Sequence, residues 1–167
     1  MDESKAQSLR NLREIPRLIE RMHRRFLDVV RLELGKQGIR DISPVQVMMM
    51  SNIGSEEISV HALIERGYYL GSNASYNLKQ LVECGYVERQ ASAQDKRSAH
   101  LKLSAKGMDT LNKLAILESQ WAEPLIKEDS TLSDIETTNK LLKKLEHCWS
   151  DAVRSSDSPN TDTVVDF

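Results

Sequence analysis

The sequence predicts a mainly α-helical fold with a small β-wing, in which a winged helix-turn-helix is flanked by longer helices on both sides. Its 167 residues include only 7 glycines, 4 prolines and 5% aromatic residues, a composition that favours long helices over a β-sandwich. Two short helical patterns separated by a tight turn occupy the middle of the chain. Two short stretches with alternating polarity follow them directly, as a hairpin wing would.

The N-terminal segment, residues 8–40, is expected to form one long helix. Pro16 lies inside the pattern and should kink the helix or mark its true start, and Gly35 and Gly38 should end it. The apolar residues recur in steps of three and four, which is the helical period: Leu9, Leu12, Ile15, Ile19, Met22, Phe26 and Val29 or Val30.

The next segment carries the first half of the helix-turn-helix. Ser43 is a suitable N-cap and is followed by Pro44 at the first helical position, so a short apolar helix should begin there. The stretch 56–60, EEISV, is a candidate strand. Ser59 should cap the helix VHALIERG at residues 60–67.

The second half contains the expected recognition helix and the wing. Ser72 should cap the helix NASYNLKQLVEC, which ends at Gly85. Beyond it, YVERQ and AHLKL alternate in polarity and flank the polar segment ASAQDKRS. This pattern predicts a β-hairpin with a long charged tip.

The C-terminal third is expected to be helical again. Ser104 should cap a helix that is interrupted near Pro124 and the polar run 127–134, and a last helix should cover residues 133–153. The polar, acidic end of the chain predicts a disordered tail. The expected organisation is therefore an N-terminal dimerisation helix at 8–40, a winged helix-turn-helix domain at 43–104, C-terminal dimerisation helices at 105–153 and the tail at 154–167.

The helix before the hairpin is the candidate DNA reader. In a helix-turn-helix, this helix enters the major groove, and residues near its N-terminus meet the base edges. A polar helix face that is merely solvated would look the same, but the adjacent wing favours DNA binding. The candidate contacts are hydrogen-bonding side chains of suitable length: Asn73, Ser75, Tyr76, Asn77, Lys79 and Gln80.

The expected hairpin is locally basic although the whole chain is not. Segment 88–107 holds five basic and two acidic residues, a charge of +3, whereas the chain has a net charge of −2 and a pI of about 6.1. Lys96 and Arg97 at the tip could contact DNA, with Arg97 in the minor groove. Asp95 could brace Arg97 through a charge-assisted hydrogen bond. The alternative is an ordinary solvated turn.

The segment LVECGYVERQASAQDKRSAHLKLSAKG resembles the MarR family of regulators. The matching pattern is a Leu-x-x-x-Gly-Tyr-Val-x-Arg entry, an Asp-x-Arg wing and a Leu-Ser-x-x-Gly exit. The stretch RGYYLGSNASYNLKQL is most similar to the alphaproteobacterial branch that includes the L,D-transpeptidase regulator. Tyr76 departs from the pattern, since many family members have a basic residue there.

The resemblance implies a homodimeric transcriptional regulator. Family members bind pseudo-palindromic double-stranded DNA operators, dimerise through their outer helices and respond to small phenolic or aromatic ligands. The apolar stripes of the first and last helices favour a dimer independently, because a second copy would cover them. An intramolecular bundle is the alternative. The expected effector site lies near Met22, Phe26, Ser43 and Met50, although such a stripe is more often plain core.

Other classes of protein find little support in the sequence. Its four histidines are scattered, no Gly-rich phosphate loop is present, and we expect neither catalysis, a metal nor a cofactor. No signal peptide or membrane-spanning run is evident, so we expect a cytoplasmic protein without a membrane partner.

Two alternative functions remain open. A winged helix can serve as a protein–protein interaction module, although such a module would not need a basic wing. A redox-sensing regulator would need a reactive cysteine, and the first helix, where some family members carry one, has none. Cys84 and Cys148 are both expected to pack in a core, where a thiol is usually inert.

Overall fold

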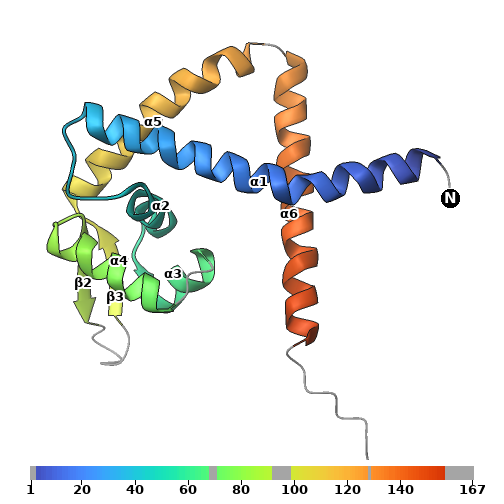
Figure 1. Ribbon diagram of the computed structural model, residues 1–167. Coiled ribbons are helices and arrows are strands. Elements are labelled where there is room, and N and C mark those ends of the chain that lie inside the picture. Colours follow the sequence, from blue (N-terminus) through green and yellow to red (C-terminus); the bar gives the residue numbers. More distant parts are fainter. Residues whose placement is uncertain (1–2, 68–70, 92–98, 128, 157–167) are drawn as a thin grey trace, which may run out of the picture. The chain divides into compact units, whose positions relative to one another are not determined.

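The computed structural model describes residues 3–67, 71–91, 99–127 and 129–156. Residues Met1–Leu117 form one compact unit and Glu118–Phe167 a second. The predicted class, mainly helical with a small β-wing, is confirmed (Figure 1). The elements in chain order are α1 (Glu3–Lys36), α2 (Pro44–Ile53), β1 (Ile58–Ser59), α3 (Val60–Gly67), α4 (Gly71–Glu83), β2 (Val87–Ala91), β3 (Ala99–Leu103), α5 (Ala105–Ile126) and α6 (Asp129–Ser156).

The predicted caps of three helices are confirmed by their hydrogen bonds. Ser43 and Gln46 form a capping box at α2: the Gln46 amide donates to Ser43 Oγ at 3.3 Å, and the Ser43 amide donates to Gln46 Oε1 at 2.8 Å. Ser59 Oγ accepts from the Ala62 amide at the start of α3. Ser104 Oγ accepts from the Gly107 amide at the start of α5.

Some predicted boundaries are wrong. The helix α1 begins at Glu3 and continues through Pro16, so the proline does not mark its start. A proline removes one backbone donor, and α1 tolerates this because residues 11–14 are exposed, so water can reach the freed carbonyl. Ser72 lies in the first turn of α4 and does not precede it. Near the C-terminus, α6 starts at Asp129 and includes residues 154–156, which we had expected in the tail.

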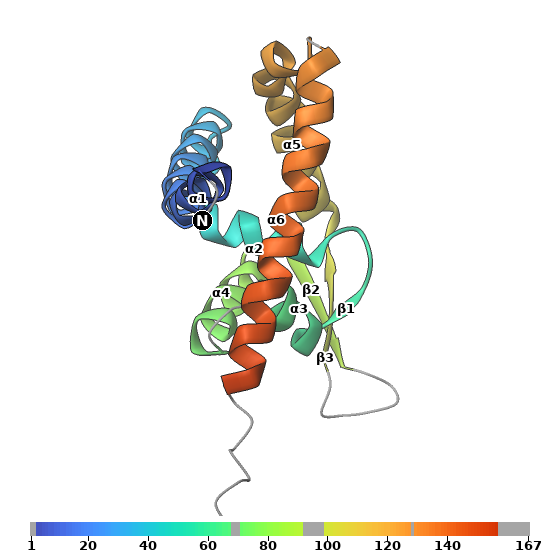
Figure 2. The same ribbon diagram turned by 90° about the vertical axis from the view of Figure 1, so that its right-hand side faces the viewer.

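The wing is part of a three-stranded antiparallel sheet with the order β1-β3-β2. The hairpin register pairs Val87 with Leu103 and Ala91 with Ala99. Val87, Leu101 and Leu103 are buried, whereas Glu88 and Lys102, which face each other across the strands, are exposed. This alternation fixes which face of the hairpin is turned toward the core. Figure 2 shows α4 on one side of the hairpin strands.

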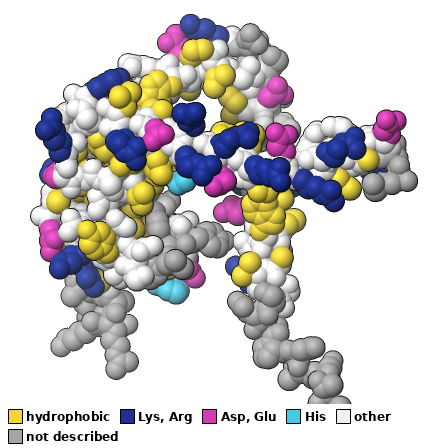
Figure 3. All heavy atoms as spheres, viewed as in Figure 1, with side chains coloured by type: hydrophobic (Ala, Val, Ile, Leu, Met, Phe, Trp, Pro, Cys, Tyr) yellow, Lys and Arg dark blue, Asp and Glu magenta, His cyan; other side chains and the backbone are white. Residues whose placement is uncertain are grey.

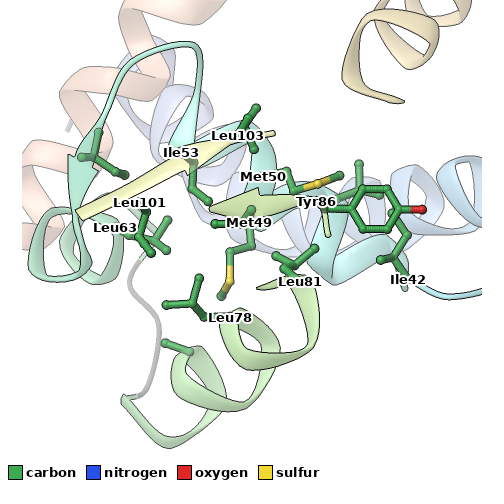
Figure 4. Close-up of a cluster of buried hydrophobic side chains, with 14 of the residues drawn as sticks. Ile42, Met49, Met50, Ile53, Leu63, Leu78, Leu81, Tyr86, Leu101 and Leu103 are labelled. Carbon is green, nitrogen blue, oxygen red and sulfur yellow. The ribbon is translucent and has the colours of Figure 1, made fainter. Parts of the chain in front are cut away.

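The core of the first unit is formed by α1, α2, α3, α4, the sheet and the first part of α5. Met49, Met50, Leu81 and Leu101 are completely shielded from solvent, and the ring of Tyr86 lies beside Met50 and Ile42 (Figure 4). In α4, Ala74, Leu78 and Leu81 are buried, at steps of four and three. The helix-turn-helix and the hairpin therefore share one core, which holds one face of α4.

Candidate nucleic-acid interface

The outward face of α4 carries the candidate base-contacting residues. Asn73, Ser75, Tyr76 and Lys79 are exposed, and Tyr76 is 65% exposed. A large aromatic side chain at this exposure has little contact with its own chain. The buried positions on the opposite face fix the rotation of α4, so its polar face is directed away from the core.

Two other predicted DNA contacts, Asn77 and Gln80, are half-buried and not fully exposed. Several of the predicted contact residues also interact with each other or with Glu83 within α4. The Asn77 side-chain amide donates to the Asn73 carbonyl at 2.9 Å. Lys79 Nζ lies 3.7 Å from a carboxylate oxygen of Glu83. These interactions are local and solvent-accessible, so a DNA partner could compete for the same groups.

The predicted wing tip lies outside the described residues. The hairpin ladder can be followed to the pair Ala91 and Ala99, and Asp95, Lys96 and Arg97 belong to the segment between them. The part of the wing that is described still contributes a basic side chain. Arg89 of β2 is exposed and lines a pocket together with Ser75, Lys79 and Glu83 of α4.

Arg89 is a candidate interface residue that sequence reasoning did not select. It belongs to the family-like motif and to the basic residues of segment 88–107, but it is not among the DNA contacts predicted from the sequence. The signal was available: Arg89 lies two residues after the buried Val87, and residues i and i+2 of a strand share a face. Its side chain therefore lies on the face of β2 that meets α4, where the pocket has a volume of about 270 Å³.

The C-terminal end of α4 is fixed by a glycine turn. The Tyr86 amide donates to the Leu81 carbonyl and the Gly85 amide to the Val82 carbonyl, which together form a Schellman motif. Gly85 has a φ of 75°, a left-handed conformation that is costly for other residues. The turn sends the chain from α4 directly into β2.

A polar cluster joins this turn to two distant parts of the chain. Tyr86 Oη donates to Asp41 Oδ1 at 2.8 Å, and Lys106 Nζ donates to Asp41 Oδ2 at 2.9 Å. Lys106 Nζ also donates to the Cys84 carbonyl at 2.9 Å and lies 3.9 Å from the centroid of the Tyr86 ring. Sequence reasoning did not identify this cluster.

The ionisation of the cluster follows from these contacts. The hydrogen bond from Lys106 lowers the pKa of the Asp41 carboxyl below its ordinary value. The same bond raises the pKa of Lys106, and burial raises the pKa of the Tyr86 hydroxyl. At neutral pH, Asp41 is therefore an acceptor while Tyr86 and Lys106 are donors, as the observed bonds require.

The residues predicted to bind an effector differ in how far they are buried. Met50 is completely buried and Phe26 packs against the same core, but Met22 is 59% exposed. Ser43 uses its hydroxyl to cap α2. A separate shallow pocket lies on the C-terminal part of α1 around Leu32.

The two cysteines differ in their surroundings. Cys84 is half-buried, and its thiol donates to the Asp41 carbonyl at 3.5 Å. Cys148 is exposed on α6, so the expectation that it packs in a core is wrong for the single chain.

The described residues contain neither a cluster of metal-binding side chains nor a helix that could cross a membrane. In residues 3–67, 71–91, 99–127 and 129–156, no group of three or more histidine, cysteine or acidic side chains could hold a metal ion. Within these same ranges, the helices fall short of the length and apolarity needed to cross a bilayer.

Comparison with known proteins identifies the family. The model of the MarR family matches residues 40–98. The chain is also 42% identical over 141 residues to the exopolysaccharide II synthesis transcriptional activator ExpG of Rhizobium meliloti (strain 1021). The match covers 84% of this chain and 73% of that protein. The chain belongs to the MarR family. As a MarR-family protein it is a DNA-binding transcriptional regulator, which confirms the coarse function that the sequence predicted.

Solved structures of MarR proteins share the fold. The structure of FabT from Streptococcus pneumoniae in complex with DNA has a TM-score of 0.66 at 20% identity and covers 84% of this chain and 99% of FabT. A MarR regulator from Methanosarcina mazei Go1 also has a TM-score of 0.66, at 22% identity, with 81% of this chain and 96% of that chain covered. A mutant MarR from E. coli complexed with operator DNA has a TM-score of 0.61 at 21% identity, covering 81% and 95%.

Proposed function

We propose that this MarR-family chain binds a pseudo-palindromic DNA operator as a homodimer and responds to a small aromatic ligand. The observation that carries the proposal is the exposed polar face of α4, held by buried Ala74, Leu78 and Leu81 beside a basic hairpin. This is the arrangement that places a recognition helix in a major groove and a wing next to it.

Each polar residue of the reading surface has a proposed role. Asn73 and Ser75 are near the N-terminal end of α4 and would meet base edges, with Tyr76 and Asn77 beside them. Lys79 and Gln80, one turn later, would reach phosphates. In the wing, Lys96 would bind phosphate and Arg97 the minor groove, with Asp95 bracing Arg97.

The need for a second copy comes from apolar surface. Many large apolar side chains are exposed in the first unit on α1 and in the second unit on the end of α5 and on α6, and Figure 3 shows hydrophobic atoms at the surface of α6. Contiguous exposed apolar patches mark interaction sites. The residues concerned are Leu9, Leu12, Ile19, Met22, Trp121, Leu125, Ile126, Leu132, Ile135, Leu142, Trp149 and Val153. In a homodimer, equivalent stripes of two chains would cover each other.

The proposal also includes an effector ligand and a place for this chain in one branch of the family. A small phenolic or aromatic ligand near Met22, Phe26, Ser43 and Met50 would have to open space between α1 and α2, because Met50 is completely buried. The stretch RGYYLGSNASYNLKQL supports a place in the branch of the L,D-transpeptidase regulator. Since its DNA partner is in the cytoplasm, the protein would act there, without enzymatic activity.

A binding experiment tests the proposal. Duplexes selected from a random-sequence library by the purified protein should contain an inverted repeat, and a gel shift should show preference over a scrambled duplex. The affinity should fall steeply between low and physiological salt, because phosphate contacts release counterions. The absence of any preferred duplex would contradict the proposal and favour the protein–protein module instead.

A further inference from the structure

We propose that Asp41, Tyr86 and Lys106 form a polar latch that fixes the recognition helix α4 on the first turn of α5, and that Asp41 is a positioning residue for sequence-specific DNA binding. The proposal rests on the function proposed above. It adds Asp41, which lies outside the sequence motifs, to Tyr86 and Lys106, and it assigns the three residues a role in specificity without contact to DNA.

The latch joins three segments that are far apart in the sequence. Asp41 lies in the connection between α1 and α2, 45 residues before Tyr86 and 65 residues before Lys106. The two oxygens of one carboxylate accept from two different partners, so neither bond competes with the other. Asp41 therefore links the Tyr86 hydroxyl to the Lys106 ammonium, which also lies against the Tyr86 ring.

Lys106 also acts directly on the end of α4. Its ammonium donates to the Cys84 carbonyl, one of the carbonyls that a helix leaves without an internal partner at its C-terminus. A cation there also interacts favourably with the helix dipole. The neighbouring Ser104 adds two bonds to the same turn: its Oγ donates to the Gly85 carbonyl at 2.6 Å, and its amide donates to the Tyr86 carbonyl at 3.0 Å.

Burial makes Asp41 necessary for Tyr86. The Tyr86 residue is 1% exposed, and its hydroxyl lies at the edge of the core (Figure 4). A buried hydroxyl without a partner is energetically costly, so loss of the acceptor favours a shift of the ring. Because Tyr86 follows α4 directly through the Schellman turn, a shift of the ring would move the end of the helix.

The length of α4 turns a small tilt into a large displacement. The helix has 13 residues. At about 1.5 Å per residue it is roughly 20 Å long, so a tilt of about 5° at the latch moves the other end by roughly 1.7 Å. Asn73 and Tyr76 lie toward that other end. Hydrogen bonds to base edges would not survive such a displacement, whereas diffuse attraction to phosphates would.

Asp41→Asn separates positioning from simple electrostatics. The variant keeps a side-chain oxygen for Tyr86 but loses the charge that holds Lys106, and it makes the protein less negative by one charge. Electrostatics alone would then strengthen binding to any DNA. The latch predicts the opposite for the selected duplex: the ratio of its affinity to that of a scrambled duplex should fall at least about fivefold, with scrambled DNA bound as well as before or better.

Asp109→Asn is the matched control. Asp109 is on α5 in an exposed pair with Lys113 at 2.7 Å, so the variant makes the same change of charge without touching the latch. Its affinity ratio should equal that of the wild type. Lys106→Met should lower the affinity ratio as Asp41→Asn does. The double variant should have a ratio no lower than that of either single variant. Lys106→Arg keeps the positive charge and should have a ratio between those of Lys106→Met and the wild type.

The outcomes are distinguishable. If the wild type prefers its selected duplex and both Asp41→Asn and Lys106→Met retain that preference, the latch is wrong and the proposed function stands. If the ratio falls equally in Asp109→Asn, the effect is one of charge, and the latch is again wrong. If the wild type itself shows no preference, the proposed function fails and the latch fails with it. Should Asp41→Asn not fold, Lys106→Met decides, because Lys106 is solvent-accessible.

Discussion

Gly107 shows how a single residue can hold two elements together. It is the third residue of α5, and its amide donates to Ser104 Oγ. A Cβ placed on Gly107 would lie less than 3.0 Å from the carbonyl oxygen of Tyr86, in a backbone position that cannot move alone. The Leu-Ser-x-x-Gly motif thus has a physical reason: the serine caps the helix, and the glycine lets the end of α4 approach it.

Gly107→Ala should destabilise the protein. The methyl group must displace the Tyr86 carbonyl, so we expect the free energy of unfolding to fall by about 1–3 kcal/mol, measured by urea denaturation. Gly35→Ala is the control, because Gly35 lies in α1 and an added Cβ meets nothing within 4 Å. That variant should be neutral or stabilising by up to ~1 kcal/mol through helix propensity. Equal effects of the two substitutions would contradict the packing argument.

Residue-level predictions from the sequence succeeded where the signal was local. The caps at Ser43, Ser59 and Ser104 could be predicted because each acts within three residues of itself. Asp41 could not, because its partners are 45 and 65 residues away. A weaker signal did exist: a tyrosine that follows a helix-ending glycine needs an acceptor for its hydroxyl if its ring is buried.

At the scale of elements, the helix-turn-helix and the hairpin were predictable because their patterns are short and amphipathic. The boundaries of α1 and α6 were less so, because exposed helix ends have no packing partner to mark them in the sequence. The start of α1 was misjudged at Pro16, because a helix can continue through a proline where the carbonyl that the proline leaves without a partner is solvated. The contact of the wing tip with DNA stays a prediction, because Lys96 and Arg97 lie outside the described residues.

Arg97→Ala should weaken binding to the selected duplex at least severalfold and leave the assembly intact. The loss follows from one fewer cation in the minor groove, where the negative potential is strong. Gel shifts at two salt concentrations would measure it. Lys140→Ala, which removes a cation paired with Glu136 on α6, is the control for charge. The wing assignment is wrong if both variants bind equally well.

At the scale of the whole molecule, the two compact units divide the work. The first unit contains α4, the wing and a buried core, whereas the described residues of the second unit are all exposed or half-buried. Helices with that much exposed apolar surface are rarely stable alone in water. The helix-turn-helix and the hairpin were therefore easier to predict than the outer helices, because their packing is completed within one chain.

Leu142→Glu should split the proposed dimer. Leu142 lies with Ile135 and Trp149 on one stripe of α6, at steps of seven, and a carboxylate there would be buried without a partner. Light scattering should show a dimer for the wild type and monomers for the variant at micromolar concentration. Lys144→Glu, on the opposite face of α6, makes a larger change of charge and should remain dimeric. A wild-type monomer would contradict the symmetric-operator mechanism.

The positions of the two tryptophans have a practical consequence. Trp121 and Trp149 are the only tryptophans of the chain, and both belong to the second unit, where they are partly exposed. Their fluorescence therefore reports on the outer helices and is insensitive to melting confined to the helix-turn-helix and the hairpin. A blue shift on concentration would track assembly, while the four tyrosines offer a separate optical signal that includes Tyr76 and Tyr86 of the first unit.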